Sequence, residues 1–219
     1  MFSETVVKML GMGVLETLYM TLFSSFVAYI LGLPIGILLV ITDRDGITPN
    51  VTLNKVVGVI VNIVRSIPFI ILLIAIMPVT RAITGTTIGA SAVIIPLIAS
   101  SAPYIARIVE SSLKEVDKGV VEAAQSMGAS PWQIVFKVLI PEAKPSLVIG
   151  SAIAISTILS YTVMAGFVGG GGLGDIAIRY GYYRYETGIM MVAVILLILI
   201  LQVIQELGSS ISKRSDKRI

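Results

Sequence analysis

Long runs of apolar residues alternate with short polar segments along the whole chain. Five apolar stretches of 20 to 27 residues contain almost no charge, at 15–41, 56–79, 88–109, 147–168 and 188–207. At about 1.5 Å per residue, a helix of this length matches the ~30 Å hydrocarbon core of a bilayer. Because the backbone in lipid must satisfy its own hydrogen bonds, the pattern predicts an all-α membrane protein with five transmembrane helices in one domain, residues 1–219.

The composition agrees with this prediction, because the chain is too apolar for a soluble domain. Of its 219 residues, 56% are hydrophobic and 13% are charged, whereas soluble domains carry about 25% charged residues. The sequence contains no Cys and no His, which excludes disulfides, the usual zinc ligands and a Ser-His-Asp triad. We therefore expect no catalytic residues, no bound cofactor and no metal site in this chain.

Basic residues are distributed unevenly between the two sides of the predicted spans. With the N-terminus outside the cell, the inner segments hold eleven Lys and Arg residues and the outer segments hold four. The inner set is Arg44, Lys55, Arg107, Lys114, Lys118, Lys137, Lys144, Lys213, Arg214, Lys217 and Arg218, and the outer set is Lys8, Arg81, Arg179 and Arg184. Since cytoplasmic loops carry the excess of basic residues, we expect the N-terminus outside and the C-terminus in the cytoplasm. The same excess explains the net charge of +3 without a nucleic-acid partner.

The longest polar segment, residues 110–145, is expected to form a cytoplasmic helical hairpin. Asp117 is suited to cap a short helix, and Gly128 is suited to the left-handed residue that ends it. The run Ser130-Pro131-Trp132-Gln133 has the features of a second helix start, with Ser at the N-cap, Pro at N1 and Gln three residues after the Ser. This second helix should stop near Pro141.

The residues alone leave two roles open for this hairpin. Small side chains at Ala123 and Ala124 would let another backbone approach, which favours docking into a groove of a partner; alternatively, the hairpin only caps the bundle. The residue order resembles the EAA loop of ABC importer permeases, in which Glu-Ala-Ala precedes a Gly by three residues, and nine further residues precede an aliphatic-x-aliphatic-Pro run. The matching residues are Glu122, Ala123, Ala124, Gly128, Val138, Ile140 and Pro141.

This resemblance implies the type I ABC importer permease fold and gives the hairpin a function. The first short helix would be the coupling helix, which sits in a cleft of the ATPase subunit and transmits nucleotide-driven closure to the spans. The coupling residues would be Glu122, Ala123, Ala124, Met127, Gly128 and Pro141. The family also implies a homodimer in the bacterial inner membrane, two separate ATPase subunits that hold ATP and Mg, and an external substrate-binding protein.

Three further segments, 65–72, 102–107 and 169–174, are similar to those of methionine-importer permeases. They imply uptake of methionine, in the L form and also in the D form. Other small permeases share the EAA loop and the Gly-rich stretch, so another small amino acid or a compatible solute is the first alternative. The second alternative is an ATP-independent secondary carrier, which would need ionisable residues within the spans, and there are almost none beyond Arg65.

Four residues are candidates for the substrate pathway or its gate. Arg65 lies within a predicted span, where a charge costs about 2.5–3.5 kcal/mol on insertion scales, so we expect it to face the interior of the dimer. Ser100, Tyr161 and Met164 lie in spans that mix small and weakly polar residues, which favour helix contact or a wet pathway.

Candidates for contact with the binding protein lie between the last two spans. The run 169–174 satisfies G-x-G-x-x-G, but it leaves a membrane span where a dinucleotide site requires a preceding strand. We expect a flexible turn at the outer mouth instead. The contact residues would be Gly171, Gly172, Tyr182 and Arg184.

Overall fold

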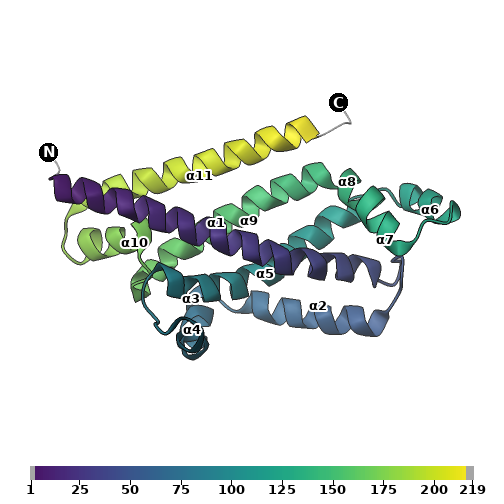
Figure 1. Cartoon of the computed structure of the whole chain (residues 1–219), viewed down its shortest axis with the longest axis horizontal. Helices are drawn as coiled ribbons and strands as arrows, with labels where there is room; N and C mark the ends of the chain where they lie inside the picture. The colour runs from purple at the N-terminus through teal and green to yellow at the C-terminus, as the bar shows by residue number, and fades with distance from the viewer. Residues whose placement is uncertain (1–2, 216–219) are drawn as a thin grey trace. The chain divides into compact units, whose positions relative to one another are not determined.

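The structure, a computed structural model, describes residues 3–215, and the regular elements in that range are all helical (Figure 1). Lys217 and Arg218, which the sequence analysis assigns to the inner tail, lie outside the described residues. The elements are α1 (Glu4–Ile41), α2 (Val51–Ser66), α3 (Phe69–Ala75), α4 (Met77–Thr84), α5 (Ala90–Lys114), α6 (Lys118–Ser126), α7 (Pro131–Ile134), the π-helical η1 (Val135–Leu139), α8 (Ile140–Glu142), α9 (Lys144–Ala165), the 3₁₀ turn η2 (Gly166–Val168), α10 (Gly172–Ile176), the π-helical η3 (Ala177–Tyr182) and α11 (Thr187–Ser215).

Within residues 3–215, four helices are long and apolar enough to cross a membrane, namely α1, α5, α9 with η2, and α11. The bent pair α2 and α3 makes a fifth span if the two are counted together. The prediction of one continuous helix over 56–79 is therefore wrong. Pro68 lacks an amide hydrogen and disfavours the helical conformation of the residue before it, so α2 ends at Ser66 and α3 begins at Phe69.

Internal contacts divide the chain into two compact units. The first consists of Met1–Val27, Ile67–Ser101 and Ile155–Gln205, and the second of Ala28–Ser66, Ala102–Ala154 and Glu206–Ile219. The four long helices each contribute residues to both units.

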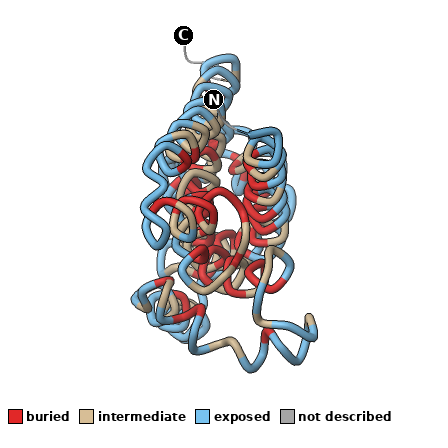
Figure 2. The backbone as a smooth tube through the Cα atoms, turned by 90° about the vertical axis from the view of Figure 1, so that its left-hand side faces the viewer, coloured by how far each residue is buried: buried red, intermediate tan, exposed pale blue. Residues whose placement is uncertain are grey.

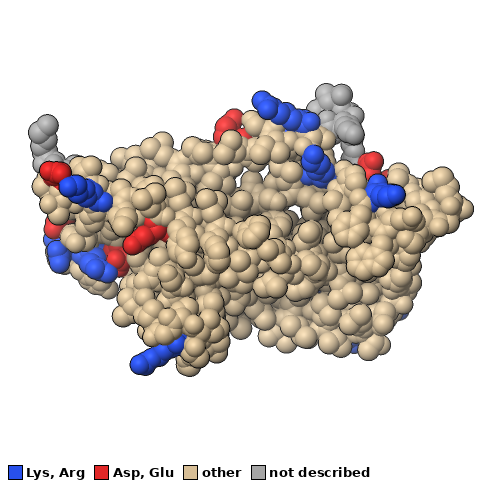
Figure 3. All heavy atoms as spheres, viewed as in Figure 1, with Lys and Arg blue, Asp and Glu red and all other residues tan. Residues whose placement is uncertain are grey.

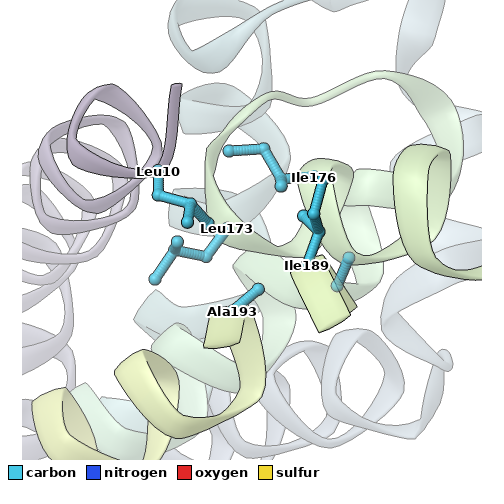
Figure 4. Close-up of a cluster of buried hydrophobic side chains, with 6 residues drawn as sticks. Leu10, Leu173, Ile176, Ile189 and Ala193 are labelled. Atoms are coloured by element: carbon cyan, nitrogen blue, oxygen red, sulfur yellow. The ribbon is translucent and has the colours of Figure 1, made fainter. Parts of the chain in front are cut away.

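The core of the first unit joins α1, α10 and α11. Leu10, Leu173, Ile176, Ile189 and Ala193 are buried together, and Figure 4 shows their side chains converging from these three helices. A shared apolar cluster of this kind holds the short α10 against the long helices through close van der Waals packing, which is the main attraction between apolar helices in a membrane.

In the second unit, close packing of α1 against α5 depends on two glycines. A Cβ atom at Gly32 would lie 2.7 Å from the carbonyl oxygen of Ala102, and one at Gly36 would lie 2.6 Å from that of Ala106. Small residues four apart allow helix backbones to approach in this way.

Helix α2 also runs alongside α1 in this unit (Figure 1). The side chain of Asn54 on α2 donates a hydrogen bond to the carbonyl of Leu39 on α1 (2.6 Å).

Large apolar side chains also cover the outer surface. Along the helices, buried and exposed positions recur on different sides (Figure 2), and the face in Figure 3 carries few charged side chains. The most apolar window of α11 has a mean hydropathy of 2.8, yet only 11% of it is buried. A helix that is apolar all round and exposed is typical of contact with lipid.

Candidate functional site

The first helix of the hairpin, α6, has the caps that the sequence predicts. The carboxylate of Asp117 accepts a hydrogen bond (2.7 Å) from an amide of the first turn. At the other end Gly128 is left-handed, with φ of 78°. Its amide donates to the carbonyl of Gln125 (2.9 Å), and the amide of Ala129 donates to that of Ala124 (3.1 Å). This pair of bonds is a Schellman motif, so the local prediction is confirmed.

The second helix begins at the capping box that the sequence predicts. The hydroxyl of Ser130 accepts from the amide of Gln133 (3.4 Å), and the side chain of Gln133 accepts from the amide of Ser130 (2.8 Å). Pro131 occupies the first helical position, where its missing amide hydrogen costs nothing.

The end of this helix contains a π turn that the sequence analysis does not foresee. The amide of Ile140 donates to the carbonyl of Val135, five residues earlier. Pro141 has no amide hydrogen, and its ring would clash with the carbonyl of Lys137 in a regular α-helix. The wider turn relieves this clash, and the helix then ends at Glu142, close to the predicted stop.

The predicted pair of small residues is divided between two environments. Ala124 is buried, at 5% exposure, whereas Ala123 and Glu122 are exposed. Met127, one of the coupling residues that the resemblance implies, is 82% exposed. Only Ala123 therefore offers a small side chain to a partner, and Ala124 packs within the unit.

Several apolar side chains of this polar segment face outward. We call Val120, Ala123, Met127, Trp132 and Phe136 the hairpin surface; all five are exposed. The rings of Trp132 and Phe136 stack with centroids 5.8 Å apart. An exposed apolar group on a charged segment is typical of an interaction site, which favours docking on a partner over a purely structural cap.

The pathway candidates fall into both units. Ser100 is buried in the first unit, and Met164 is exposed there. Tyr161, also in the first unit, stacks on Phe69 with centroids 4.5 Å apart and planes 6° apart. Arg65 is exposed in the second unit. Phe69 is a neighbour of Tyr161 that the sequence analysis did not single out, since no local pattern relates positions this far apart in the chain.

The glycine run is not the flexible turn that the sequence predicted. Gly172 is buried, and its amide donates to the carboxylate of Glu16 (2.7 Å); the amide of Leu173 donates to the hydroxyl of Thr17 (2.9 Å). The N-cap of α10 is Gly171, which has no side chain to accept these bonds. Two α1 side chains supply the acceptors instead, and this fixes the run in place. Gly172 is consequently not accessible to a binding protein in this arrangement.

The other two contact candidates are accessible. Tyr182 and Arg184 are both exposed. The guanidinium of Arg184 lies 4.7 Å from the centre of the Tyr180 ring, a cation–π contact. The ring of Tyr182 meets that of Tyr183 edge to face at 5.3 Å. Tyrosine and arginine are enriched among residues that dominate interfaces, so this loop presents a surface suited to a protein partner.

Known proteins match the chain over most of its length. A probable D-methionine transport system permease protein MetI from Vibrio cholerae is 50% identical over 203 residues, covering 93% of this chain and 90% of the relative. The D-methionine transport system permease protein MetI of Escherichia coli K12 is 49% identical over 164 residues, covering 75% and 76%. A chain of the MetNI methionine ABC transporter, in inward-facing conformations, has a TM-score of 0.97 at 46% identity and covers 99% of this chain and 100% of that one.

The family match includes the hairpin, the Gly-rich run and the whole of the last four predicted spans. It extends over residues 32–219, and the family is described as the binding-protein-dependent transport system inner membrane component. The chain belongs to this family of inner membrane transport components.

Proposed function

We propose that the chain is the membrane permease subunit of an ATP-driven importer of methionine, in both the L and the D form. The observation that carries this proposal is the likeness of the whole chain to the MetNI methionine ABC transporter, with a TM-score of 0.97 at 46% identity. Relatives of similar length that are about half identical are named as D-methionine permeases, which favours methionine over another small amino acid or a compatible solute.

The hairpin would transmit the energy of ATP hydrolysis to the spans. Two copies of the chain form the pathway, and two separate ATPase subunits, which hold ATP and Mg, dock on the two hairpin surfaces. The exposure of Ala123, Met127 and Trp132 supports this role, because such side chains become buried at a protein interface. ATP-driven closure would bring the two α6 helices together and turn the spans outward, and release of the products would reopen the inner side.

On the outer side of the membrane, the substrate must be delivered to the permease. With the N-terminus outside, the segment between α9 and α11 faces the periplasm and the hairpin faces the cytoplasm. The exposed Tyr182 and Arg184 would contact the external binding protein. The chain itself binds no nucleotide, and the sequence has no G-x-x-x-x-G-K-[ST] run.

Uptake into vesicles tests this proposal. The chain is purified with the ATPase that co-isolates with it, reconstituted, and supplied with the binding protein and labelled L- or D-methionine. We expect labelled methionine to accumulate only when ATP is enclosed within the vesicles. Other small amino acids and glycine betaine should compete only weakly with methionine uptake. Uptake that is independent of ATP would identify a secondary carrier, and uptake of another solute that methionine does not inhibit would identify a different substrate.

A further inference from the structure

A series of ionic contacts lies at the base of the hairpin in the second unit. On α5, the guanidinium of Arg107 pairs with Glu110 (2.5 Å), and Glu110 pairs in turn with the ammonium of Lys114 (3.0 Å). Lys114, the last residue of α5, also pairs with Asp43 in the loop after α1 (2.7 Å). Arg107 extends the series to α2, because it donates a hydrogen bond to the side chain of Asn62 (2.9 Å).

These contacts are shielded from water to different degrees. The side chain of Glu110 is 12% exposed and that of Arg107 is 24% exposed, so this end of the series is largely buried. Asp43 is more exposed, yet the hydrogen bond from Lys114 lowers the pKa of its carboxyl group, and the bond from the amide of Arg44 acts in the same direction. Asp43 therefore carries its charge throughout the physiological pH range.

The loop after α1 and helix α6 both border a pocket. The pocket, of about 350 Å³, is lined by residues of both, including Asp43, Ile47, Val121 and Gln125. Within α6, Ala124 is the buried residue. The direct pair between the two segments, Lys118 with Asp45, is long at 3.5 Å, and both side chains are about three-quarters exposed. Such exposed pairs contribute little. The shorter Asp43–Lys114 pair (2.7 Å) connects the same loop to the end of α5, from which the hairpin begins.

We propose that Asp43 and Lys114 are positioning residues that transmit movement of the hairpin to α1 and α2. Lys114 lies three residues before Asp117, the cap of α6, so a rotation of the hairpin about the end of α5 displaces the ammonium group. Through Asp43 the displacement reaches the end of α1, and through Glu110 and Arg107 it reaches α2. This inference rests on the proposed function, because it concerns how the hairpin drives the spans.

A double-mutant cycle in the complete importer tests the pair. Asp43→Asn keeps the acceptor for the Arg44 amide. Lys114→Met removes the ammonium group but keeps an unbranched side chain of nearly the same length, and the double variant combines the two substitutions. We expect each single variant to reduce methionine uptake per ATP hydrolysed about fivefold, the equivalent of ~1 kcal/mol for a partly exposed pair. The double variant should lose no more than the stronger single variant. Multiplied losses, or wild-type uptake in both single variants, would overturn the proposal.

Two matched variants serve as controls, one for the net charge of the loop and one for the cation at position 114. Asp45→Asn removes the same charge from the same loop but from the long, exposed pair, and it should leave uptake unchanged. Lys114→Arg preserves the cation and should retain most of the uptake. If Asp45→Asn reduces uptake as strongly as Asp43→Asn, the net charge of the loop matters and the specific pair does not.

Hydrogen exchange of the purified full chain tests the same pair without transport. Asp43→Asn and Lys114→Met should each raise amide exchange in the loop 43–50 and in α6, whereas Asp45→Asn should not. Unchanged exchange in both variants would contradict the pair as a link. This measurement needs neither ATP nor substrate, so it tests the Asp43–Lys114 link independently of transport. Absence of methionine uptake by the wild-type importer would reject the proposed function but would not affect this test of the link.

Discussion

Two buried threonines of α1 show that the surroundings of a residue determine how much it contributes to stability. Thr17 accepts a hydrogen bond from the amide of Leu173 at the start of α10 (2.9 Å). Thr21, one turn later on the same helix, is fully buried, and its hydroxyl has no hydrogen-bond partner among the described residues. The same residue type is therefore a cap for a distant helix at one position and an uncompensated polar group at the other.

Replacement of each threonine with the isosteric valine should separate these roles. Thr17→Val leaves the buried amide of Leu173 without an acceptor and should lower the free energy of unfolding by about 1–3 kcal/mol. Thr21→Val removes a hydroxyl that has no partner, so stability should be unchanged or slightly higher. Thermal unfolding in detergent measures both. Equal destabilisation by the two substitutions would show that α1 does not cap α10.

Gly128 provides a second contrast at the level of one residue. Its φ of 78° ends α6, and apart from its two chain neighbours no described residue lies within 4 Å of the place where a Cβ would stand. Gly128→Val should therefore act through backbone strain of about 1–2 kcal/mol, fraying α6 and reducing ATP-driven uptake. Asn adopts the left-handed conformation more readily than Val, so Gly128→Asn should keep most of the uptake. If both variants lose uptake equally, the side chain itself blocks docking and the backbone conformation is not the cause.

At the level of the element, α1 contains a packed glycine and a free one. A Cβ at Gly36 would lie 2.6 Å from the carbonyl oxygen of Ala106, whereas at Gly11 no described residue beyond the local backbone of α1 lies within 4 Å of the Cβ position. Gly36→Ala should destabilise the chain by about 1–3 kcal/mol because α1 and α5 must move apart. Gly11→Ala should stabilise it by up to about 1 kcal/mol through helix propensity. Thermal unfolding that ranks the two variants in the opposite order would contradict the packing of α1 on α5.

Local signals in the sequence were sufficient for the hairpin but not for the glycine run. The caps at Asp117, Gly128 and Ser130 depend on residues at most a few positions apart, and the structure has all three. The position of Gly172 depends on a hydrogen bond from its amide to the carboxylate of Glu16, which is 156 positions away in the sequence. No periodicity in one segment reveals such a partner, so a run that looks flexible in the sequence is fixed by the fold.

The broken second span illustrates a different reason for error. Hydropathy measures how well a segment tolerates lipid, and the residues around Pro68 are apolar on both sides. The interruption is conformational, because it arises from the missing amide hydrogen of Pro68 and from the restricted residue before it. Pro68 was visible in the sequence, but an average over an apolar window does not register it.

At the scale of the whole molecule, most of the surface is suited to lipid and a small part is suited to proteins. The chain is 56% hydrophobic and 13% charged, and many large apolar side chains are exposed. Against this background, the hairpin surface and the Tyr182–Arg184 loop differ because exposed aromatic residues lie beside charged ones. The pathway residues could not be identified in the same way, since a pathway formed by two copies is not completed within one chain.

The hairpin surface is proposed to couple the chain to an ATPase, and the substitution Ala123→Glu is a direct test of that role. Ala123 is exposed, so the substitution should leave folding and membrane insertion of the chain unchanged. A charge buried without a partner at the docking interface would be costly. Gln125→Glu, which places the same charge at a residue lining the pocket of α6, is the matched control.

The measurement is ATP-driven methionine uptake by the reconstituted importer, with co-isolation of the ATPase followed in parallel. If the ATPase docks on the hairpin surface, Ala123→Glu should reduce both by at least tenfold, a loss of about 1.4 kcal/mol or more in coupling, while Gln125→Glu retains both. Wild-type uptake and normal ATPase binding in the Ala123→Glu importer would show that the ATPase does not dock on the hairpin surface.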